Sequence, residues 1–393
     1  MTTAETNTVH KDVASAAQDL LAYCEKRDFA GYDPYDALNS PLLRLVSLGM
    51  KWPRIAVTQA VKKLPWNLRP LFLIPRGHNP KGLGLFLWSC AKLYAVDPKP
   101  EYLERIDHLL DLLETVKGHP EHGVGWGYNF PWQSRAFYVP RGTPTIVNTS
   151  FVTHALLDTY EITGNERALQ MALPVKEFLL NDLHRTGNDE EFCFAYTPID
   201  QLIVHNANLL GASVLIRLHQ VEPDERARAA ALASLAYSMN RQREDGSWWY
   251  ADTDYQQWID SFHTGFNLQC IEYILKAGEG ESYREGFEKG VKYYAENFFL
   301  EDGTAKYFHD RTYPIDVHSY AQAMVFFSEQ GSRYSELVDR VAGKFLETFR
   351  DSSGYFYFQI KPGHVIKIPY MRWSQSWSLH ALTHYLVQNA ESA

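Results

Sequence analysis

Two kinds of hydrophobic pattern alternate along the chain, and the alternation repeats six times. One kind of segment begins with small polar residues and then becomes almost entirely apolar, with few charges beyond its first turn. Such segments are typical of helices that are enclosed on most sides. After the first, they start about 55 to 60 residues apart, a period that indicates a repeat architecture. We therefore expect six inner helices, over residues 79–94, 148–163, 205–220, 260–277, 316–331 and 372–386.

The other kind of segment has the period of an amphipathic helix with a charged outer face. Five such segments follow inner helices, and the N-terminal segment supplies the sixth partner by packing beside the last inner helix. This packing closes a ring, and no linker composition divides the chain. We therefore expect one all-α domain over residues 1–393, with outer helices over residues 11–27, 99–117, 165–183, 224–242, 281–299 and 333–350.

Aromatic runs with turn residues connect each outer helix to the next inner helix. Their composition predicts short β-hairpins or extended loops, for example over residues 190–198 and 245–254. All of them should lie on the face of the ring that holds the inner N-termini, which makes this face the functional one. Residues 30–78 exceed the other connections in length, and we expect them to form a cap or one wall of the cavity mouth. The basic residues of the stretch from Lys51 to Lys81 are suited to steer an acidic polymer or a diphosphate.

Composition excludes several classes of function. The chain has 38 Lys and Arg against 47 Asp and Glu, a net charge of −9, so we expect no nucleic-acid partner. Its four cysteines are far apart, and His380 and His384 lack the Glu of a zinc-protease motif, so we expect no metal and no cofactor. The polar N-terminus and short apolar runs predict a cytoplasmic protein without a membrane span.

The order of six inner and six outer helices resembles the (α/α)6 toroids of carbohydrate-active proteins. Two phrases, GYDPYDALNS from Gly31 and RWSQSW from Arg372, look like those of toroid proteins in exopolysaccharide biosynthesis. The resemblance implies an (α/α)6 toroid with a saccharide ligand. Glycoside hydrolases, uronate lyases and sugar epimerases share this architecture, so the resemblance indicates a class of substrate rather than one reaction.

Four residues at two successive inner N-termini are the main candidates for acid–base chemistry. Asp260 and Asp316 precede His263 and His318 at similar positions. Capping of the helices explains the aspartates but does not require the histidines. Glycoside hydrolysis needs one carboxyl group to protonate the leaving oxygen and another to activate water or attack carbon. We assign these roles to the aspartates, with the histidines in support.

The phrase near the start of the chain adds two further carboxyl groups. Asp33 and Asp36 lie close together, near the chain end that should return to the ring. They are candidates for catalysis, and a structural turn explains them equally well.

The same mouth also suits a reaction on a uronate. Six helix dipoles converge there, which favours an anionic group. In this alternative, Arg372, Asn148 and Asn206 hold the carboxylate while a Tyr or His removes the adjacent proton, giving C5 epimerisation or elimination. The candidate tyrosine bases are Tyr128, Tyr138, Tyr250 and Tyr320.

A saccharide site also needs aromatic faces and polar groups that bind hydroxyls. The predicted substrate-binding residues are Asn148, His205, Asn206, Trp132, Trp249, Arg372, Trp373 and Gln375. We expect an enzyme that acts on an oligosaccharide or polysaccharide, in the biosynthesis or tailoring of a cell-surface polymer, and we slightly favour hydrolysis. The alternatives are a uronate C5-epimerase or lyase, and a non-catalytic glycan-binding or scaffold subunit of a polysaccharide-synthesis complex.

Overall fold

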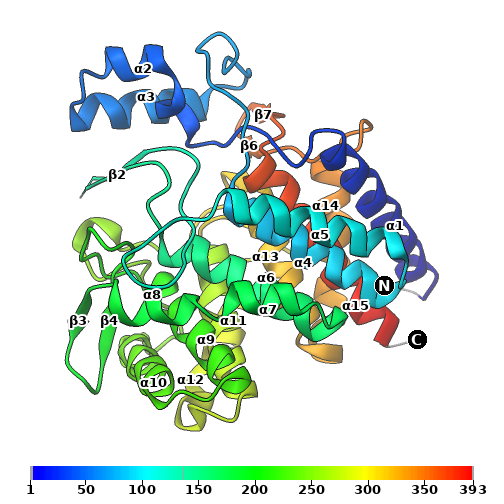
Figure 1. Ribbon diagram of the computed structural model, residues 1–393. Coiled ribbons are helices and arrows are strands. Elements are labelled where there is room, and N and C mark those ends of the chain that lie inside the picture. Colours follow the sequence, from blue (N-terminus) through cyan, green and yellow to red (C-terminus); the bar gives the residue numbers. More distant parts are fainter. Residues whose placement is uncertain (1–2, 136, 392–393) are drawn as a thin grey trace.

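The computed structural model describes residues 3–135 and 137–391 (Figure 1). Its inner helices form a closed ring. Each one packs against the next along the chain, and α15 packs against α4. This arrangement confirms the predicted (α/α)6 toroid. The inner helices are α4 (Pro80–Val96), α6 (Ile146–Thr163), α9 (His205–Val221), α11 (Ser261–Lys276), α13 (Val317–Ser328) and α15 (Trp377–Glu391), which continues from the π-helix η5 (Met371–Ser376).

The outer helices surround this ring, and the N-terminal helix α1 packs against both α14 and α15. One outer helix differs from the prediction. The segment expected as a single helix over residues 165–183 is two short helices, because Pro174 lacks an amide hydrogen and its ring disfavours helical continuation. The outer helices are α1 (Thr3–Glu25), α5 (Pro100–Thr115), α7 (Glu166–Ala172), α8 (Val175–Asn181), α10 (Glu225–Met239), α12 (Arg284–Asn297) and α14 (Ser335–Phe349).

Short antiparallel strands occur in the predicted aromatic connections. β1 pairs with β2, β3 pairs with β4, and β5, β6 and β7 form a three-stranded sheet. These pairings confirm hairpins in some of the connections. Residues 245–254 contain no strand, and an isolated bridge joins Ala251 to Val204. The strands are β1 (Trp132–Gln133), β2 (Tyr138–Val139), β3 (Arg185–Gly187), β4 (Phe192–Phe194), β5 (Ile315–Asp316), β6 (Gln359–Lys361) and β7 (His364–Ile366), and short 3-10 turns are η2 (Asp254–Gln256), η3 (Glu281–Tyr283) and η4 (Gly331–Tyr334).

Glycine sets the turn that leads from an outer helix into its connection. Gly246, Gly303 and Gly354 have φ values of 90°, 85° and 85°, which other residues rarely adopt. A side chain at Gly246 or Gly303 would also collide with the backbone of the following outer helix. The same tight turn therefore recurs after α10, α12 and α14.

The N-termini of the inner helices begin as the sequence indicates in two repeats and differ in another. Asp260 caps α11 by accepting from the His263 amide, and Asp316 caps α13 by accepting from the His318 amide. Asn148 was expected to begin α6, but Thr145 caps that helix and Asn148 lies in its first turn.

A helical arm leaves the ring between α1 and α4. It contains the 3-10 helix η1 (Asp36–Asn39) and the helices α2 (Pro41–Val46) and α3 (Lys51–Lys63), which project from one end of the ring in Figure 1. Buried Arg69 fastens the arm, because its Nε lies 2.8 Å from Asp36 and its Nη2 donates to the Asp33 carbonyl at 2.9 Å. Among the described residues, no helix has the length and hydropathy that crossing a bilayer requires.

Candidate active site

A cavity of about 860 Å³ opens among the N-termini of the inner helices. Its wall is built from α3, from the connections around β1, and from the first turns of α4, α9, α11 and α13. The π-helix η5 completes it, so residues from Tyr35 to Trp373 meet there. The volume lies within the range of sites for small molecules, and aromatic and polar side chains share its surface.

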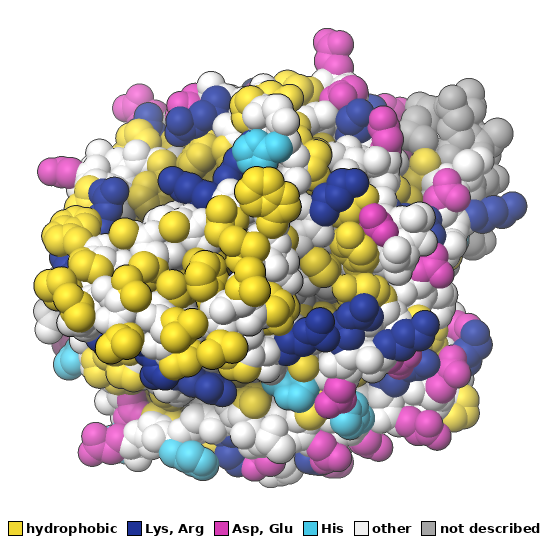
Figure 2. Space-filling view, turned by 90° about the horizontal axis from the view of Figure 1, so that it is seen from above, with side chains coloured by type: hydrophobic (Ala, Val, Ile, Leu, Met, Phe, Trp, Pro, Cys, Tyr) yellow, Lys and Arg dark blue, Asp and Glu magenta, His cyan; other side chains and the backbone are white. Residues whose placement is uncertain are grey.

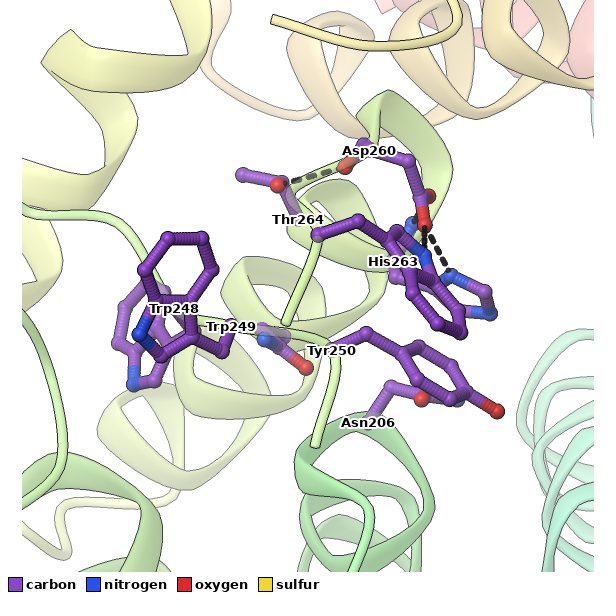
Figure 3. A pocket seen from close by; sticks show the side chains of 9 residues that line it. Asn206, Trp248, Trp249, Tyr250, Asp260, His263 and Thr264 are labelled. Carbon is purple, nitrogen blue, oxygen red and sulfur yellow. Dashed lines mark hydrogen bonds and ion pairs between the residues drawn. The ribbon is translucent and has the colours of Figure 1, made fainter. Parts of the chain in front are cut away.

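The cavity brings together eight of the residues predicted from the sequence. A second, much smaller space adjoins it, and Asp260 and Trp249 line this space with Asn206 and His263 (Figure 3). Neither space is lined by Asp33, Asp36, Asp316, Asn148, His205 or Gln375. The predicted residues in the wall of the large cavity are Tyr128, Trp132, Asn206, Tyr250, His263, His318, Arg372 and Trp373.

His263 is held in place by the carboxylate that caps its helix. Its Nδ1 lies 2.7 Å from Oδ2 of Asp260, which also accepts from Trp258 Nε1 at 2.9 Å (Figure 3). Because a carboxylate accepts hydrogen bonds, this contact places the proton of His263 on Nδ1. The side chain is 22% exposed. Nε2 is therefore the basic nitrogen available to a ligand, and Asp260 stabilises the ring when it becomes positively charged.

His318 stands beside it without a hydrogen-bond partner. Among the described residues, neither ring nitrogen has one, although the side chain is buried. Its ring stacks on Phe262 at 4.5 Å, and the ring of His263 lies 4.4 Å from the same phenyl group. Burial lowers the pKa of His318 well below its usual range, and the charges of Lys81 and Arg372 lower it further. The ring is therefore neutral at pH 7.

Lys81 adds an unpaired amine to the same wall. It lies in the first turn of α4, is 4% exposed, and forms no ion pair with any described carboxylate. Its Nζ lies 3.8 Å from the centre of the Phe151 ring. Burial lowers the pKa of this lysine well below its usual range, and repulsion by Arg372 adds to the effect. An anionic ligand would restore the ammonium form.

Arg372 joins the two ends of the chain inside the wall. Its Nε lies 2.5 Å from Oδ2 of Asp33, and its Nη2 lies 2.9 Å from Oδ1. Both side chains are buried. Such a bidentate pair fixes the orientation of the guanidinium group, which also lies near the ring of Tyr128. Asp33 therefore positions Arg372 rather than facing the cavity itself.

Several tyrosines contribute phenol groups to the cavity. Tyr128 and Tyr196 share a hydrogen bond of 2.9 Å between their oxygens. Burial raises the pKa of both phenols, and it raises the pKa of Tyr250 and Tyr307 as well. These groups stay protonated at neutral pH, which makes them hydrogen-bond donors rather than bases.

Basic side chains are the ionisable groups that dominate the wall. Four of them line the cavity, and no Asp or Glu does so among the described residues. Lys63 and Arg135 are exposed, whereas Lys81 and Arg372 are buried, so little water would screen the action of these two on a bound anion. The wall thus suits a negatively charged ligand or a negative charge that develops during a reaction. The four basic side chains are Lys63, Lys81, Arg135 and Arg372.

The second capping carboxylate, Asp316, lies behind the wall and accepts three hydrogen bonds. Asp316 is buried and accepts from Trp373 Nε1 at 2.9 Å, from Gln359 Nε2 at 2.7 Å and from the His318 amide at 3.0 Å. Burial raises its pKa, and these three donors act in the opposite direction. Its position fits a residue that holds Trp373 and the start of α13 in place.

The remaining predicted residues also lie away from the cavity. Asp36 binds Arg69, and burial raises its pKa to about 6. His205 contacts Asp252 at 2.9 Å, and Gln375 exchanges two hydrogen bonds with the backbone of Phe356. Asn148 is buried, and its side-chain amide has no hydrogen-bond partner among the described residues.

Sequence reasoning did not select Lys81, Tyr196 or Gln59, all of which line the cavity. One signal was present for Lys81, because it is a charged residue in the first turn of an otherwise apolar inner segment. No cluster of three or more His, Cys, Asp or Glu side chains suited to a metal ion occurs in the described part of the chain.

Comparison with known proteins supports the fold. No known family profile matches the chain, and no curated protein matches its sequence. Three solved structures are similar: a cellobiose 2-epimerase from Bacillus thermoamylovorans (TM-score 0.63, 16% identity, 80% of this chain and 88% of that one), a GH76 α-mannanase from Bacteroides thetaiotaomicron (0.61, 12%, 81% and 88%) and a polysaccharide lyase (0.54, 14%, 79% and 90%).

These comparisons define the class of architecture. The chain has the (α/α)6-toroid fold, and the solved proteins that share it include an epimerase, a glycoside hydrolase and a lyase that act on saccharides. At such low identity the likeness concerns the fold alone. The reaction of this chain must therefore be argued from its own cavity.

Proposed function

We propose that the protein is a saccharide epimerase that moves the proton on C5 of a uronate residue. The observation that carries this proposal is the composition of the cavity wall. Two imidazoles and four basic side chains line it, and no carboxyl group does so among the described residues. This set suits the removal and return of a proton next to a carboxylate.

His263 is the group that removes the proton. Its Nε2 is the available base, and Asp260 lies 2.7 Å from Nδ1 to stabilise the imidazolium that forms. His318 provides a second imidazole on the same wall, in contact with the same phenyl ring of Phe262. Epimerisation also needs a protonated group that delivers a proton to the opposite face of the carbon. His318 is neutral, so a protonated phenol such as that of Tyr250 fills this role. It then regains a proton from solvent as His263 releases the one it took.

Lys81 and Arg372 stabilise the negative charge. Loss of the C5 proton adds charge beside a carboxylate that is already negative, so the transition state depends on nearby cations. Arg372 is fixed by Asp33, and Lys81 has no carboxylate partner of its own among the described residues. The phenols of Tyr128 and Tyr250 stay protonated and can donate to sugar oxygens.

Glycoside hydrolysis by Asp260 and Asp316 has less support. Each of these carboxylates accepts three hydrogen bonds, and each side chain is buried. Hydrolysis requires carboxyl groups that reach the scissile bond and a water molecule. In the geometry found, Asp260 acts through His263 instead.

The biological setting is a further part of the proposal. Asp33 belongs to the phrase GYDPYDALNS and Arg372 to RWSQSW, so both phrases contribute to one ion pair beside the cavity. This supports our proposal that the substrate is a cell-surface polysaccharide, or a precursor of one, handled in the cytoplasm.

The test is incubation of uronate oligosaccharides with the protein in deuterated water. We expect deuterium at C5, without new reducing ends and without the ultraviolet absorbance of an unsaturated uronate. Absorbance without epimerisation would show a lyase, and new reducing ends would show a hydrolase. Binding of these saccharides with none of the three reactions would show a scaffold, and each of these results would overturn the proposal.

A further inference from the structure

The helical arm carries an apolar face that the ring does not cover. Among the described residues, fifteen large hydrophobic side chains are exposed, and nine of them lie between residues 42 and 73. Trp66 is 69% exposed and Leu71 is 72% exposed. A soluble surface rarely gathers so many large apolar side chains in one short segment. The nine are Leu42, Leu45, Val46, Leu48, Met50, Trp52, Trp66, Leu71 and Leu73.

The other face of α3 is already in use. Ile55, Gln59 and Lys63 are four residues apart and line the cavity wall, while Thr58 and Val61 are buried. Val61 packs with Ala37 and Ile74 in a small core of the arm. The outward apolar side chains are therefore not needed for the packing of the arm.

This surface differs in charge from the rest of the molecule. The chain has a net charge of −9, yet residues 37–96 contain no Asp or Glu. Arg44, Lys51 and Arg76 are exposed on the arm, and none of them forms an ion pair with a described carboxylate. Viewed from the end of the molecule above the arm, a broad area of hydrophobic side chains is bordered by Lys and Arg (Figure 2).

We propose that this arm docks on an anionic lipid bilayer. Exposed leucines and tryptophans beside unpaired cations are the side chains that anchor an interfacial helix in the headgroup region. With 13 residues, α3 is too short to span a bilayer, so it would lie on the membrane instead. A second copy of the chain fits this face less well, because a two-fold contact would place the same cations against each other without a carboxylate to pair them.

Docking has a consequence for the cavity. The arm presents residues of α3 to the cavity, and it presents the exposed apolar side chains of α2, Trp52 and residues 66–73 to the bilayer. The opening therefore comes to lie beside the lipid surface. This inference does not depend on the reaction, since it rests on the outward face of the arm alone.

The experiment is flotation of the full-length protein with vesicles of phosphatidylcholine and phosphatidylglycerol, compared with vesicles of phosphatidylcholine alone. We expect binding to the anionic vesicles, weakening as salt is added, and little binding to the neutral ones. The triple variant Leu45→Ser, Trp52→Ser, Leu71→Ser should lose at least about tenfold in binding. These side chains are exposed, so its unfolding temperature should stay close to that of the parent.

A matched control replaces exposed apolar side chains elsewhere. The variant Val96→Ser, Leu300→Ser, Val365→Ser changes the same number of exposed hydrophobic residues and should bind vesicles like the parent. Equal binding by the arm variant and the parent would overturn the proposal, as would absence of binding to anionic vesicles. A dimer in solution that the arm variant dissolves, without any vesicle binding, would instead assign the face to a second copy.

Discussion

Both ends of the inner ring hold buried histidines and charged groups, but the two ends differ in how these groups are paired. At the C-terminal ends of the inner helices, Arg217 lies 2.7 Å from Asp158, 2.8 Å from Glu161 and 3.1 Å from His154. At the N-terminal mouth, Lys81 has no described carboxylate partner and His318 has no hydrogen-bond partner among the described residues.

This difference distinguishes structural from functional burial. An unpaired polar group in the interior costs free energy, so folding alone does not favour it. Toward the C-terminal ends of the inner helices, the network around Arg217 meets that cost with carboxylates, whereas His380 Nδ1 and His384 Nε2 have no hydrogen-bond partner among the described residues. At the mouth, Lys81 and His318 are buried without a carboxylate partner among the described residues. An anionic ligand would supply a partner and so lower the free-energy cost of their burial. The comparison therefore assigns stability to one end and binding to the other.

The largest expected effect is on catalysis at the mouth. His263→Gln removes the base but keeps a side chain of similar size, so the rate of C5 exchange should fall by about 10² to 10⁴. The unfolding temperature should change little, because the imidazole is partly exposed. Steady-state kinetics and thermal unfolding measure the two quantities.

The matched control is His384→Gln. His384 lies in α15, does not line the cavity, and is 3.3 Å from Glu329. The substitution should lower stability while the rate per folded molecule stays at the parental value. A loss of rate in this variant as large as that in His263→Gln would break the distinction between the two ends.

The next effect is on the free energy of unfolding, through the ion-pair network around Arg217. Arg217→Met leaves the partly buried Asp158 without its closest cation, and it should lower the free energy of unfolding by about 3 kcal/mol. Urea denaturation measures this change. Retained stability would show that the network does not hold the ring together.

Removal of the unpaired amine of Lys81 should raise the free energy of unfolding, whereas the loss of Arg217 lowers it. Lys81→Met replaces a buried amine without a described carboxylate partner by an apolar side chain, and should raise the free energy of unfolding by about 1 kcal/mol while it lowers activity. Urea denaturation and kinetics of the same preparation test both parts. Lower stability in the variant would mean that the lysine serves the fold.

The last effect is a pH dependence of stability at His318. Burial lowers its folded pKa well below 6.5, so the unfolded chain binds a proton that the folded protein does not in the interval between the two values. Stability should therefore fall as pH decreases through about 6.5, by up to about 1.4 kcal/mol per pH unit. In His318→Gln this contribution should vanish, which urea midpoints at several pH values will show. An unchanged slope would contradict the assignment.

The fold could be predicted because each repeat carries its own signal. An apolar segment after small polar residues identifies an inner helix wherever the ring later places it, and capping aspartates mark two of the starts. The break at Pro174 was also readable locally. The start of α6 was misplaced by three residues, because Thr145 and Asn148 are both residues that can cap a helix.

The site was less predictable, since orientation and burial are tertiary properties. Asp316 looks like an exposed carboxylate in the sequence, yet it turns back onto its own helix and Trp373. Lys81 looks like one member of a basic stretch, and only the closed ring reveals its burial. The pair of Asp33 and Arg372 joins residues 339 positions apart, which no spacing rule connects.

The central claim is that the unpaired polar groups at the mouth bind an anionic ligand. It is tested most directly by comparing the binding of saccharides with and without carboxylates. Calorimetry compares uronate oligosaccharides with the same compounds after reduction of their carboxyl groups, for the parent and for Lys81→Met. We predict that the parent binds the uronates at least about tenfold more tightly and that the variant loses most of this preference. Equal affinity of the parent for both compounds would contradict the account.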